Sequence, residues 1–327
     1  MTMTRRATTA AIGMLAAGAR GLSAQTPADG PLLTRYRIAT IGAPDLAAVE
    51  KMYTADLGLS VREKGRVSDA TAASWSAPKS AGRPYILLSS DTSRDVYIRA
   101  VEVDPVPGYK ALNTVGWNAI EIIIKDIDTL HKKLKQSKFR FIGEPAPLGR
   151  YPTIVAMQVI GPAEEVLFLT TETGDASKSS LPVAQSMVDR VFIMVGAAGD
   201  LPAMRDWYSG NFNMKPNVIN DSGWDVTRQL QGRPVGDKFT TTLLYLKNHG
   251  NIMQLDGYPA PAQARPRAPG QLPPGVAMTS FAVPSLDALK VKFLSPPAKL
   301  DGAAYNGRRA ATAIGAGTEL AEFIEGD

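Results

Sequence analysis

Apolar residues recur along this chain in a pattern that occurs twice with the same spacing. Residues 36–42 predict a short strand, and Asp45 then opens a helical pattern that contains Tyr53 and ends at residues 57–59. An Asp at a helix start can cap the free amide groups, and a Gly just past the end, here Gly58, can take the left-handed conformation that stops the helix. The segment therefore predicts a strand followed by one capped helix.

The same order returns in the second half of the chain. Residues 190–195 predict a strand, Asp200 opens a helix, and residues 212–214 end it. A Tyr lies eight positions after the capping Asp in both copies, Tyr53 in the first and Tyr208 in the second. Such internal repetition predicts related structural units.

A second type of copy lies between these two and again after them. Residues 117–124 and 276–283 predict strands, and the helices expected after them begin at Asp126 and Ser285. Each of the four copies then continues into further strand-like segments. We therefore expect four βαβββ modules.

The four modules predict an α+β protein. One helix and about four strands are too few to bury both faces of a sheet, so we expect the modules to pair into two curved mixed sheets, each with a cavity inside and helices outside. Pairing in chain order gives a first domain over 31–173 and a second over 186–327, with a Ser/Lys-rich linker at 174–185. The Pro-rich run 258–275 is the expected connector inside the second domain.

The first residues differ in composition from the rest of the chain. Arg5 and Arg6 precede a weakly apolar run at 10–19, and small residues stand before Gln25. This order is typical of an export signal over 1–24 with cleavage near Ala24, and the paired arginines suit a twin-arginine route. We therefore expect a periplasmic or secreted protein, with a disordered basic tail as the alternative.

Composition narrows the function further. Without the three arginines of residues 1–24, 33 basic residues face 31 acidic ones, which gives no reason to expect a nucleic-acid partner. The sequence has no cysteine, so disulfides, thiolate nucleophiles and cysteine-bound metals are excluded. We expect a small-molecule ligand and no membrane contact after signal removal, and the sequence leaves monomer and homodimer open.

The repeated series of strand, Asp-Leu helix start, Tyr53 and Leu57-Gly58-Leu59 resembles the vicinal-oxygen-chelate superfamily. That group includes glyoxalase I, extradiol dioxygenases and bleomycin-binding proteins. The resemblance spans roughly residues 34–326 and implies the fold described above. It leaves the reaction open, because the superfamily contains lyases, isomerases, dioxygenases and binding proteins.

Superfamily enzymes usually hold a divalent ion with His, Gln or Glu side chains from the first and last strands of paired modules. The resemblance transfers these positions to Ile38, Arg99, Ala119 and Phe168 in the first domain, and to Arg190, Gln254, Met278 and Glu322 in the second. Most of these side chains lack a donor or carry a repelling charge, so we expect no metal and no other cofactor. A weaker alternative places an ion on Gln254 and Glu322.

The two histidines of the sequence also argue against a metal site. His131 lies on the polar side of a predicted helix, and His249 lies in a turn. A two-histidine iron site is therefore close to excluded.

Glu121 is the expected acid or base of the first cavity. It is the single acid of strand 117–124 and follows Ala119 by two positions, so alternation puts both side chains on one face. Burial among apolar groups favours the neutral carboxyl, and this tuning suits proton transfer. Arg99, on a neighbouring strand, would hold a carboxylate or enolate oxygen. A structural ion pair between Glu121 and Arg99 is the alternative.

The remaining site candidates fall into two groups. The expected substrate-binding wall of the first cavity, which could equally be core, consists of Ile38, Thr40, Tyr97, Trp117, Ala119 and Phe168. The second-cavity candidates, which could equally form a salt-bridge network, are Arg190, Gln254, Asp256, Ser280 and Glu322. We favour the first cavity, because an apolar wall with one acid and one base suits a small, partly aromatic ligand.

Two functions remain. In the first, the protein is a metal-independent lyase or isomerase that moves a proton next to a carbonyl or on an oxygenated aromatic compound. In the second, it captures a small molecule without chemistry, as bleomycin-resistance proteins do. We favour the enzyme, because a lone acid in an apolar strand is costly unless it is used or paired.

Overall fold

The computed structural model describes residues 30–149, 151–222, 225–234, 236–260 and 262–326. The export signal expected at 1–24 lies outside these residues. Among the helices of the described residues, none is long and apolar enough to cross a membrane.

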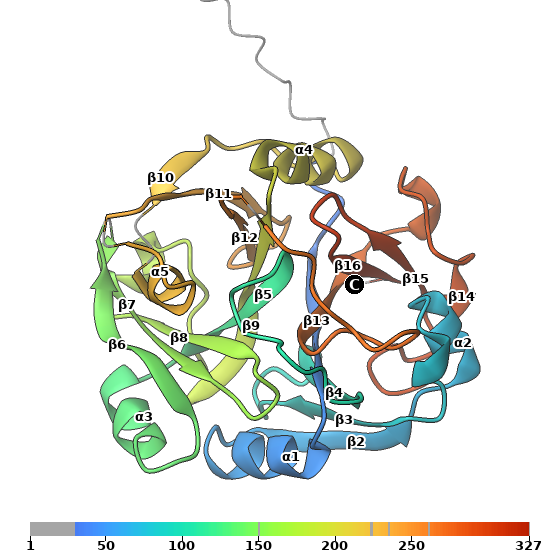
Figure 1. The fold of residues 1–327 in the computed structure, drawn as a ribbon, viewed down its shortest axis with the longest axis horizontal. Helices are drawn as coiled ribbons and strands as arrows, with labels where there is room; N and C mark the ends of the chain where they lie inside the picture. The colour runs from blue at the N-terminus through green and yellow to red at the C-terminus, as the bar shows by residue number, and fades with distance from the viewer. Residues whose placement is uncertain (1–29, 150, 223–224, 235, 261, 327) are drawn as a thin grey trace, which may run out of the picture.

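Four modules follow one another along the chain (Figure 1). The first contains β1 (Arg35–Ala43), α1 (Leu46–Ala55), β2 (Ser60–Arg66), α2 (Asp69–Ser74), the 3-10 turn η1 (Pro78–Ser80), β3 (Pro84–Ser89) and β4 (Tyr97–Glu102). The second contains β5 (Gly116–Ile124), α3 (Ile127–Leu134), β6 (Arg140–Leu148), β7 (Tyr151–Ile160) and β8 (Val166–Glu172).

The 3-10 turn η2 (Ala176–Lys178) leads into the second half of the chain. The third module contains β9 (Val188–Ala198), α4 (Leu201–Asn211), β10 (Asn220–Ser222), α5 (Asp225–Leu230), β11 (Phe239–Tyr245) and β12 (Ile252–Gly257). The fourth contains β13 (Gly275–Val283), the 3-10 turn η3 (Leu286–Ala288), β14 (Ala298–Lys299), β15 (Arg309–Ile314) and β16 (Leu320–Glu325).

The local signals that predicted the helices are confirmed in three of the four modules. Asp45 and Asp200 cap α1 and α4, each accepting a bond of 2.9 Å from the amide three residues on. Gly58 and Asn213 follow those helices in the left-handed conformation, with φ of +75° and +52°. In the fourth module the expected helix is wrong. Only η3 forms, because the chain then extends so that Phe293 bridges to β15.

The modules pair into two eight-stranded mixed sheets. Sheet one, with the order β14-β15-β16-β13-β1-β4-β3-β2, joins the fourth module to the first. Sheet two, with the order β10-β11-β12-β9-β5-β8-β7-β6, joins the third module to the second. The α+β class and the curved eight-stranded sheets are confirmed.

The expected order of pairing is wrong. Residues 31–173 and 186–327 are not the units that form the sheets, and the segment 174–185 connects two modules of the same sheet. The central contacts are the antiparallel pairs β1 with β13 and β5 with β9. Chain order alone does not predict which modules meet, because these central pairs join strands that are far apart in the sequence.

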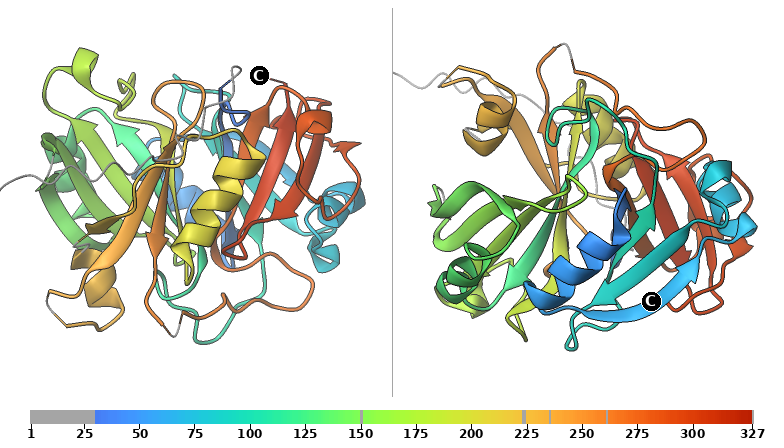
Figure 2. Two further views of the ribbon diagram at one scale, coloured as in Figure 1. Left: turned by 90° about the horizontal axis from the view of Figure 1, so that it is seen from above. Right: turned by 60° about the horizontal axis from the view of Figure 1, so that its bottom comes forward.

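The two sheets lie side by side, and α1 and α4 cover the two ends of their junction (Figures 1 and 2). The largest apolar cluster spans this junction and includes residues of both sheets. Each helix sends a tyrosine into it. Tyr53 of α1 donates a bond of 2.7 Å to Glu165, next to β8, and Tyr208 of α4 packs on Trp117 and Phe281.

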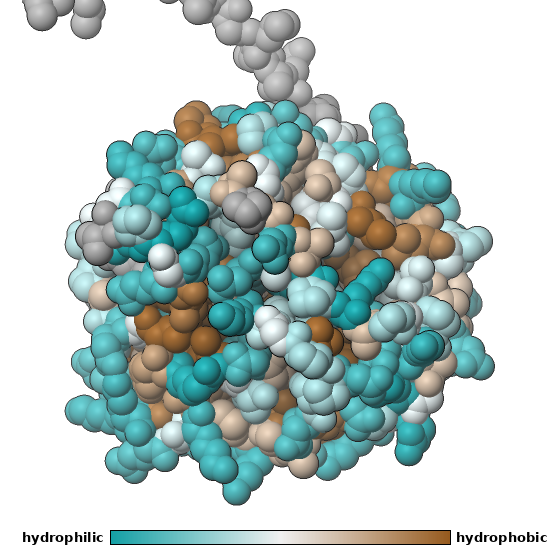
Figure 3. Space-filling view, viewed as in Figure 1, coloured by the Kyte–Doolittle hydropathy of each residue, from teal (hydrophilic) through white to brown (hydrophobic). Residues whose placement is uncertain are grey.

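A short helix follows the second strand of one module in each sheet, α2 in sheet one and α5 in sheet two. In sheet two, α5 lies within the curve (Figure 1), and Val226 and Leu230 pack on the apolar cluster that contains Ala119 and Phe168. Helix α2 holds the equivalent place in sheet one, between the second and third strands of its module. On the face seen in Figure 3, hydrophilic residues predominate and the apolar patches are separate.

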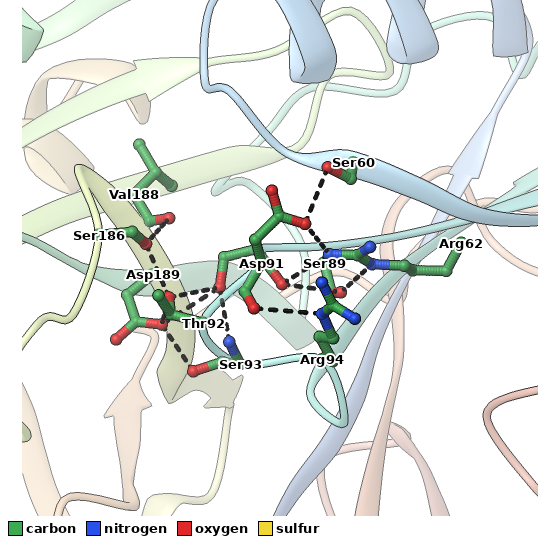
Figure 4. Close-up of polar contacts among 11 residues, drawn as sticks. Ser60, Arg62, Ser89, Asp91, Thr92, Ser93, Arg94, Ser186, Val188 and Asp189 are labelled. Atoms are coloured by element: carbon green, nitrogen blue, oxygen red, sulfur yellow. Dashed lines mark hydrogen bonds and ion pairs between the residues drawn. The ribbon is translucent and has the colours of Figure 1, made fainter.

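A polar cluster also ties the sheets together (Figure 4). Asp189 at the start of β9 is buried, and its carboxylate accepts bonds from Ser90 (3.2 Å), Thr92 (3.0 Å) and Ser93 (2.6 Å), which follow β3. The backbone N–H of Gln185 donates a fourth hydrogen bond to this carboxylate, of 2.9 Å. This single carboxylate therefore joins a loop of sheet one to a strand of sheet two.

Candidate functional site

The concave face of sheet one holds a cavity of about 200 Å³. Arg99, Trp75 and Tyr305 are buried side chains that line it, and they form its floor. The residues around the mouth are polar or small: Glu63, Gly65, Arg66, Ser68, Asp301 and Gly302.

Strand register brings the polar residues of the floor together. Thr40 on β1 lies beside Arg99 on the parallel strand β4, and Ser280 on β13 lies beside Glu322 on the parallel strand β16. Because β1 and β13 pair at the centre of the sheet, the two modules place these four side chains on one concave face.

The guanidinium of Arg99 is held by side chains from three directions. Its Nε and Nη2 donate to Thr40 Oγ1 at 3.1 and 2.9 Å, Nη1 donates to the hydroxyl of Tyr305 at 2.6 Å, and Nη2 donates to Glu322 Oε2 at 3.3 Å. The indole of Trp75 stacks on it, with the guanidinium carbon 4.5 Å from the ring centroid. The cation is thus fixed in orientation and lies on an aromatic face.

Glu322 is fully buried, and four donors reach its two oxygens. Trp75 Nε1 (2.8 Å) and the Tyr305 hydroxyl (2.7 Å) donate to Oε1, while Ser280 Oγ and Arg99 Nη2 donate to Oε2. A carboxylate has about four acceptor sites, so this one is saturated. Glu322 therefore holds the floor together and has no lone pair to offer as a base.

Burial and charge pairing act against each other at Arg99. Burial alone would lower the pKa of its guanidinium, but Tyr305 and Glu322 outweigh burial, and the pKa lies above its usual value. Burial raises the pKa of Tyr305, with Glu322 adding to the effect. At neutral pH the floor therefore contains a charged guanidinium and a neutral phenol.

The predicted residues of the first cavity divide between the two sheets. Ile38 and Tyr97 belong to one apolar cluster with Tyr305, beside Thr40 and Arg99 in sheet one. Ala119, Glu121 and Phe168 lie in sheet two. The expected shared cavity of Glu121 and Arg99 is therefore wrong, because it assumed that the first module pairs with the second.

Trp117 lines neither concave face. Its ring packs between the sheets, 6.4 Å from that of Tyr208 and 6.2 Å from that of Phe281, and its Nε1 donates to the Leu320 carbonyl at 2.7 Å. A register shift between Trp117 and Ala119 breaks the alternation, so the two side chains point to opposite faces.

The pKa of Glu121 is raised, as the sequence predicted, but the residue lies in sheet two and not beside Arg99. Burial raises its pKa to about 7, and the bond of 2.5 Å from the Thr170 hydroxyl partly opposes that rise. The cluster of Ala119 and Phe168 surrounds this strand, with α5 packed over it. Glu121 is therefore a buried acid on the apolar side of sheet two, in a different sheet from Arg99.

The second-cavity candidates are also divided. Ser280 and Glu322 belong to the floor of sheet one. In sheet two, Gln254 donates to both oxygens of Asp256 at 3.1 Å, and burial raises the pKa of Asp256 to about 6. Arg190 lies in the narrow groove between the sheets, beside Asp189, and not in a cup.

The residues at the positions of the superfamily's metal ligands do not fit a divalent ion. In sheet one these positions are Ile38, Arg99, Met278 and Glu322, and the single carboxylate among them is saturated by its four donors. In sheet two, Ala119 and Phe168 offer no donor atoms. The described residues contain no group of three or more His, Asp or Glu side chains that could hold a metal ion.

The lining residues that sequence reasoning missed include Glu63, Trp75, Tyr85 and Tyr305. Trp75 directly follows α2, and Tyr305 lies in the loop before β15. Both lie outside the repeated strands from which the candidates were taken. One available signal was the Gly-Arg-Pro turn at Gly82 and Gly232, which follows α2 and α5 and marks them as equivalent insertions over the two concave faces.

No family model and no curated protein sequence matches the chain. Among solved structures, glyoxalase I from Zea mays superposes with a TM-score of 0.58 and 15% identity, over 89% of this chain and 92% of that chain. A single-substitution variant of that enzyme gives a TM-score of 0.60 with the same identity and coverage. A Bacillus subtilis protein provisionally assigned as a dioxygenase gives 0.56 and 11% identity, over 90% and 85%.

These likenesses confirm the resemblance to the vicinal-oxygen-chelate superfamily as one of fold. At such identities they leave the ligand and the reaction open.

Proposed function

We propose that this protein binds a small planar compound carrying a carboxylate or carbonyl oxygen, in the cavity of sheet one and without a metal ion. The single observation that carries the proposal is the buried guanidinium of Arg99. Arginine has five N–H donors, and four hydrogen bonds to described residues engage this one. One donor of a fixed cation is thus left for a ligand oxygen.

The walls of the cavity support the planar part of the ligand. Trp75, Tyr85 and Tyr305 line it together with Leu87 and Ala304. Small-molecule sites are mostly apolar and aromatic, with a few fixed polar groups that orient the ligand. A flat ligand with one oxygen toward Arg99 matches that composition.

A pocket of this kind suits simple ligand binding as well as an enzyme that transfers a proton. The lyase or isomerase reaction expected of Glu121 loses its support, because Glu121 belongs to sheet two, apart from Arg99 and the cavity of sheet one. Binding is therefore the function that the geometry supports best. The basic and weakly apolar residues 1–24 support the further proposal that the protein acts in the periplasm or outside the cell.

Three probes of one shape and different charge test this function: benzoate, benzamide and benzamidine, titrated by calorimetry at low salt. We expect benzoate to bind most tightly and benzamidine not at all. The paired variant Arg99→Met with Glu322→Leu should abolish benzoate binding, whereas Glu121→Gln, in the other sheet, should leave it unchanged. Preferential binding of benzamidine, or benzoate binding that survives the paired variant, would contradict the proposal.

A further inference from the structure

The wall of the same cavity carries a second carboxylate, on a neighbouring pair of strands. Glu63 on β2 and Tyr85 on β3 both line the cavity. The hydroxyl of Tyr85 donates to Glu63 Oε1, and the amide of Ala303, from the fourth module, donates to Oε2 at 2.6 Å. Two donors from different modules thus fix this carboxylate at the cavity wall.

Two glycines make room for this arrangement. Gly65 lies opposite Tyr85 in the strand pair, and a Cβ there would come within 2.8 Å of the phenol ring. Gly302 has φ of +103°, and a Cβ there would lie 3.1 Å from the Tyr85 hydroxyl. The ring therefore lies directly against the backbone of β2, and the loop before β15 closes over its hydroxyl. A larger residue at either glycine would push against Tyr85, so both glycines help to keep its hydroxyl on Glu63.

The pair shares its cavity with the cation of Arg99. Unlike Glu322, Glu63 accepts two hydrogen bonds from the described residues, so lone pairs remain on its carboxylate. Burial, followed by the bond to Glu63, raises the pKa of Tyr85, so the phenol stays protonated and keeps donating. A carboxylate with spare lone pairs and a fixed cation together meet the needs of proton removal next to a carbonyl, where negative charge develops on the oxygen.

We propose that Glu63 is a general base that removes a proton from the carbon next to the carbonyl of the bound ligand, with Tyr85 as its positioning residue. This inference rests on the proposed function. The C–H bond breaks, the proton passes to a Glu63 oxygen, and the electron pair moves into an enolate whose oxygen accepts the remaining N–H of Arg99. Return of the proton to the same carbon gives exchange with solvent, and return to the next conjugated carbon gives an isomer. No oxidant or reductant is needed.

Hydrogen exchange of phenylpyruvate in deuterium oxide tests the step. This probe has an aromatic ring, a carboxylate, a ketone and exchangeable hydrogens at C3, whose loss is followed by proton NMR. We expect the protein to accelerate exchange above the buffer rate. Glu63→Gln should lower the protein-dependent rate by about 10²- to 10⁴-fold while benzoate binding is retained. Glu121→Gln is the matched control, because it removes a buried carboxylate from the other sheet, and it should exchange phenylpyruvate as the unaltered protein does.

The variant Tyr85→Phe tests whether Tyr85 positions Glu63 for proton removal or only supports the fold of the cavity. Without the phenol donor the Glu63 carboxylate keeps only its bond from Ala303, so we expect the maximal exchange rate kcat to fall about 10-fold or more while KM for phenylpyruvate stays nearly unchanged. An unchanged kcat would overturn the role of Tyr85. Exchange no faster than in buffer, or Glu63→Gln as active as the unaltered protein, would overturn the role of Glu63. If benzoate still binds in those cases, the proposed function stands; if benzoate does not bind, that function fails first.

Discussion

Arg99 and Glu322 take equivalent places in the two modules of sheet one, and their side chains meet, with Arg99 Nη2 3.3 Å from Glu322 Oε2. Each lies on the last strand of its module, beside Thr40 and Ser280 respectively. The two positions that the sequence resemblance equates with metal ligands thus hold a salt bridge between two buried side chains. The buried cation in the cavity of sheet one is therefore the guanidinium of Arg99.

Breaking this pair from one side should be costly. Glu322→Ala leaves the Arg99 guanidinium buried without its counter-charge, and we expect a loss of about 3–5 kcal/mol in the free energy of unfolding, measured by urea denaturation. The paired replacement Arg99→Met with Glu322→Leu should lose less than the two single replacements added together, because neither charge stays buried alone, although Trp75, Tyr305 and Ser280 still lose their acceptor. A single variant as stable as the unaltered protein would contradict the prediction.

The protein should be more stable at pH 5 than at pH 8. Burial raises the pKa of Glu121, Glu165 and Glu319 to about 7, and that of Asp256 to about 6. The folded state therefore holds protons that the unfolded state has released, and stability falls as pH rises from about 4.5 to about 7. Each group contributes on the order of 1–3 kcal/mol.

Thermal unfolding at pH 5 and pH 8 measures this effect. The pKa of Glu325 is lowered to about 2, chiefly by its bond from Arg309, so this group stabilises the folded state more as pH rises. That change occurs below about pH 4.5 and so lies outside the range between pH 5 and pH 8. A melting temperature that rises from pH 5 to pH 8 would show that other groups dominate.

Glu121→Gln should stabilise the protein at pH 8 and leave its stability at pH 5 nearly unchanged. The amide oxygen can still accept the Thr170 hydroxyl, while the buried negative charge that forms above about pH 7 is removed. We expect a gain of about 1–2 kcal/mol at pH 8 by urea denaturation. An equal change in the free energy of unfolding at pH 5 and pH 8 would mean that the substitution acts through packing and not through the charge of Glu121.

The carboxylate of Asp189 should contribute strongly to the junction of the sheets. Asp189→Ala leaves the hydroxyls of Ser90, Thr92 and Ser93 without this acceptor, and we expect a loss of about 2–3 kcal/mol in the free energy of unfolding. Asp91→Ala is the control in the same cluster (Figure 4), because Asp91 is exposed and solvent screens its pair with Arg62, so this variant should lose much less stability. Similar losses in both variants would contradict the prediction.

The sequence predicted what short-range contacts determine. The caps at Asp45 and Asp200, the stops at Gly58 and Asn213, and the strands between them depend on neighbours in the chain, and each forms as expected. Arg99 was identified as an anion holder from its place on a strand. Its setting in a cavity wall supports that role.

The partners of these residues depend on distant segments and could not be predicted in the same way. Glu121 and Arg99 were placed together because their modules follow one another, yet the first module pairs with the fourth. Trp117 was assigned to a cup by alternation, and one register shift reversed it. Tyr305 and Trp75 come from loops, where no periodic pattern marks the direction of a side chain.

The pairing of the first module with the last also determines when the cavity can form. Sheet two is one uninterrupted stretch of polypeptide, whereas sheet one needs β16, which ends at Glu325. During synthesis from the N-terminus, β1 can pair with β4 early, but it meets β13, and through it β16, only after those strands have left the ribosome. A nascent or truncated chain that stops before Leu320 lacks Glu322, and with it the counter-charge of Arg99, so the floor of the pocket is complete only after β16 has been made.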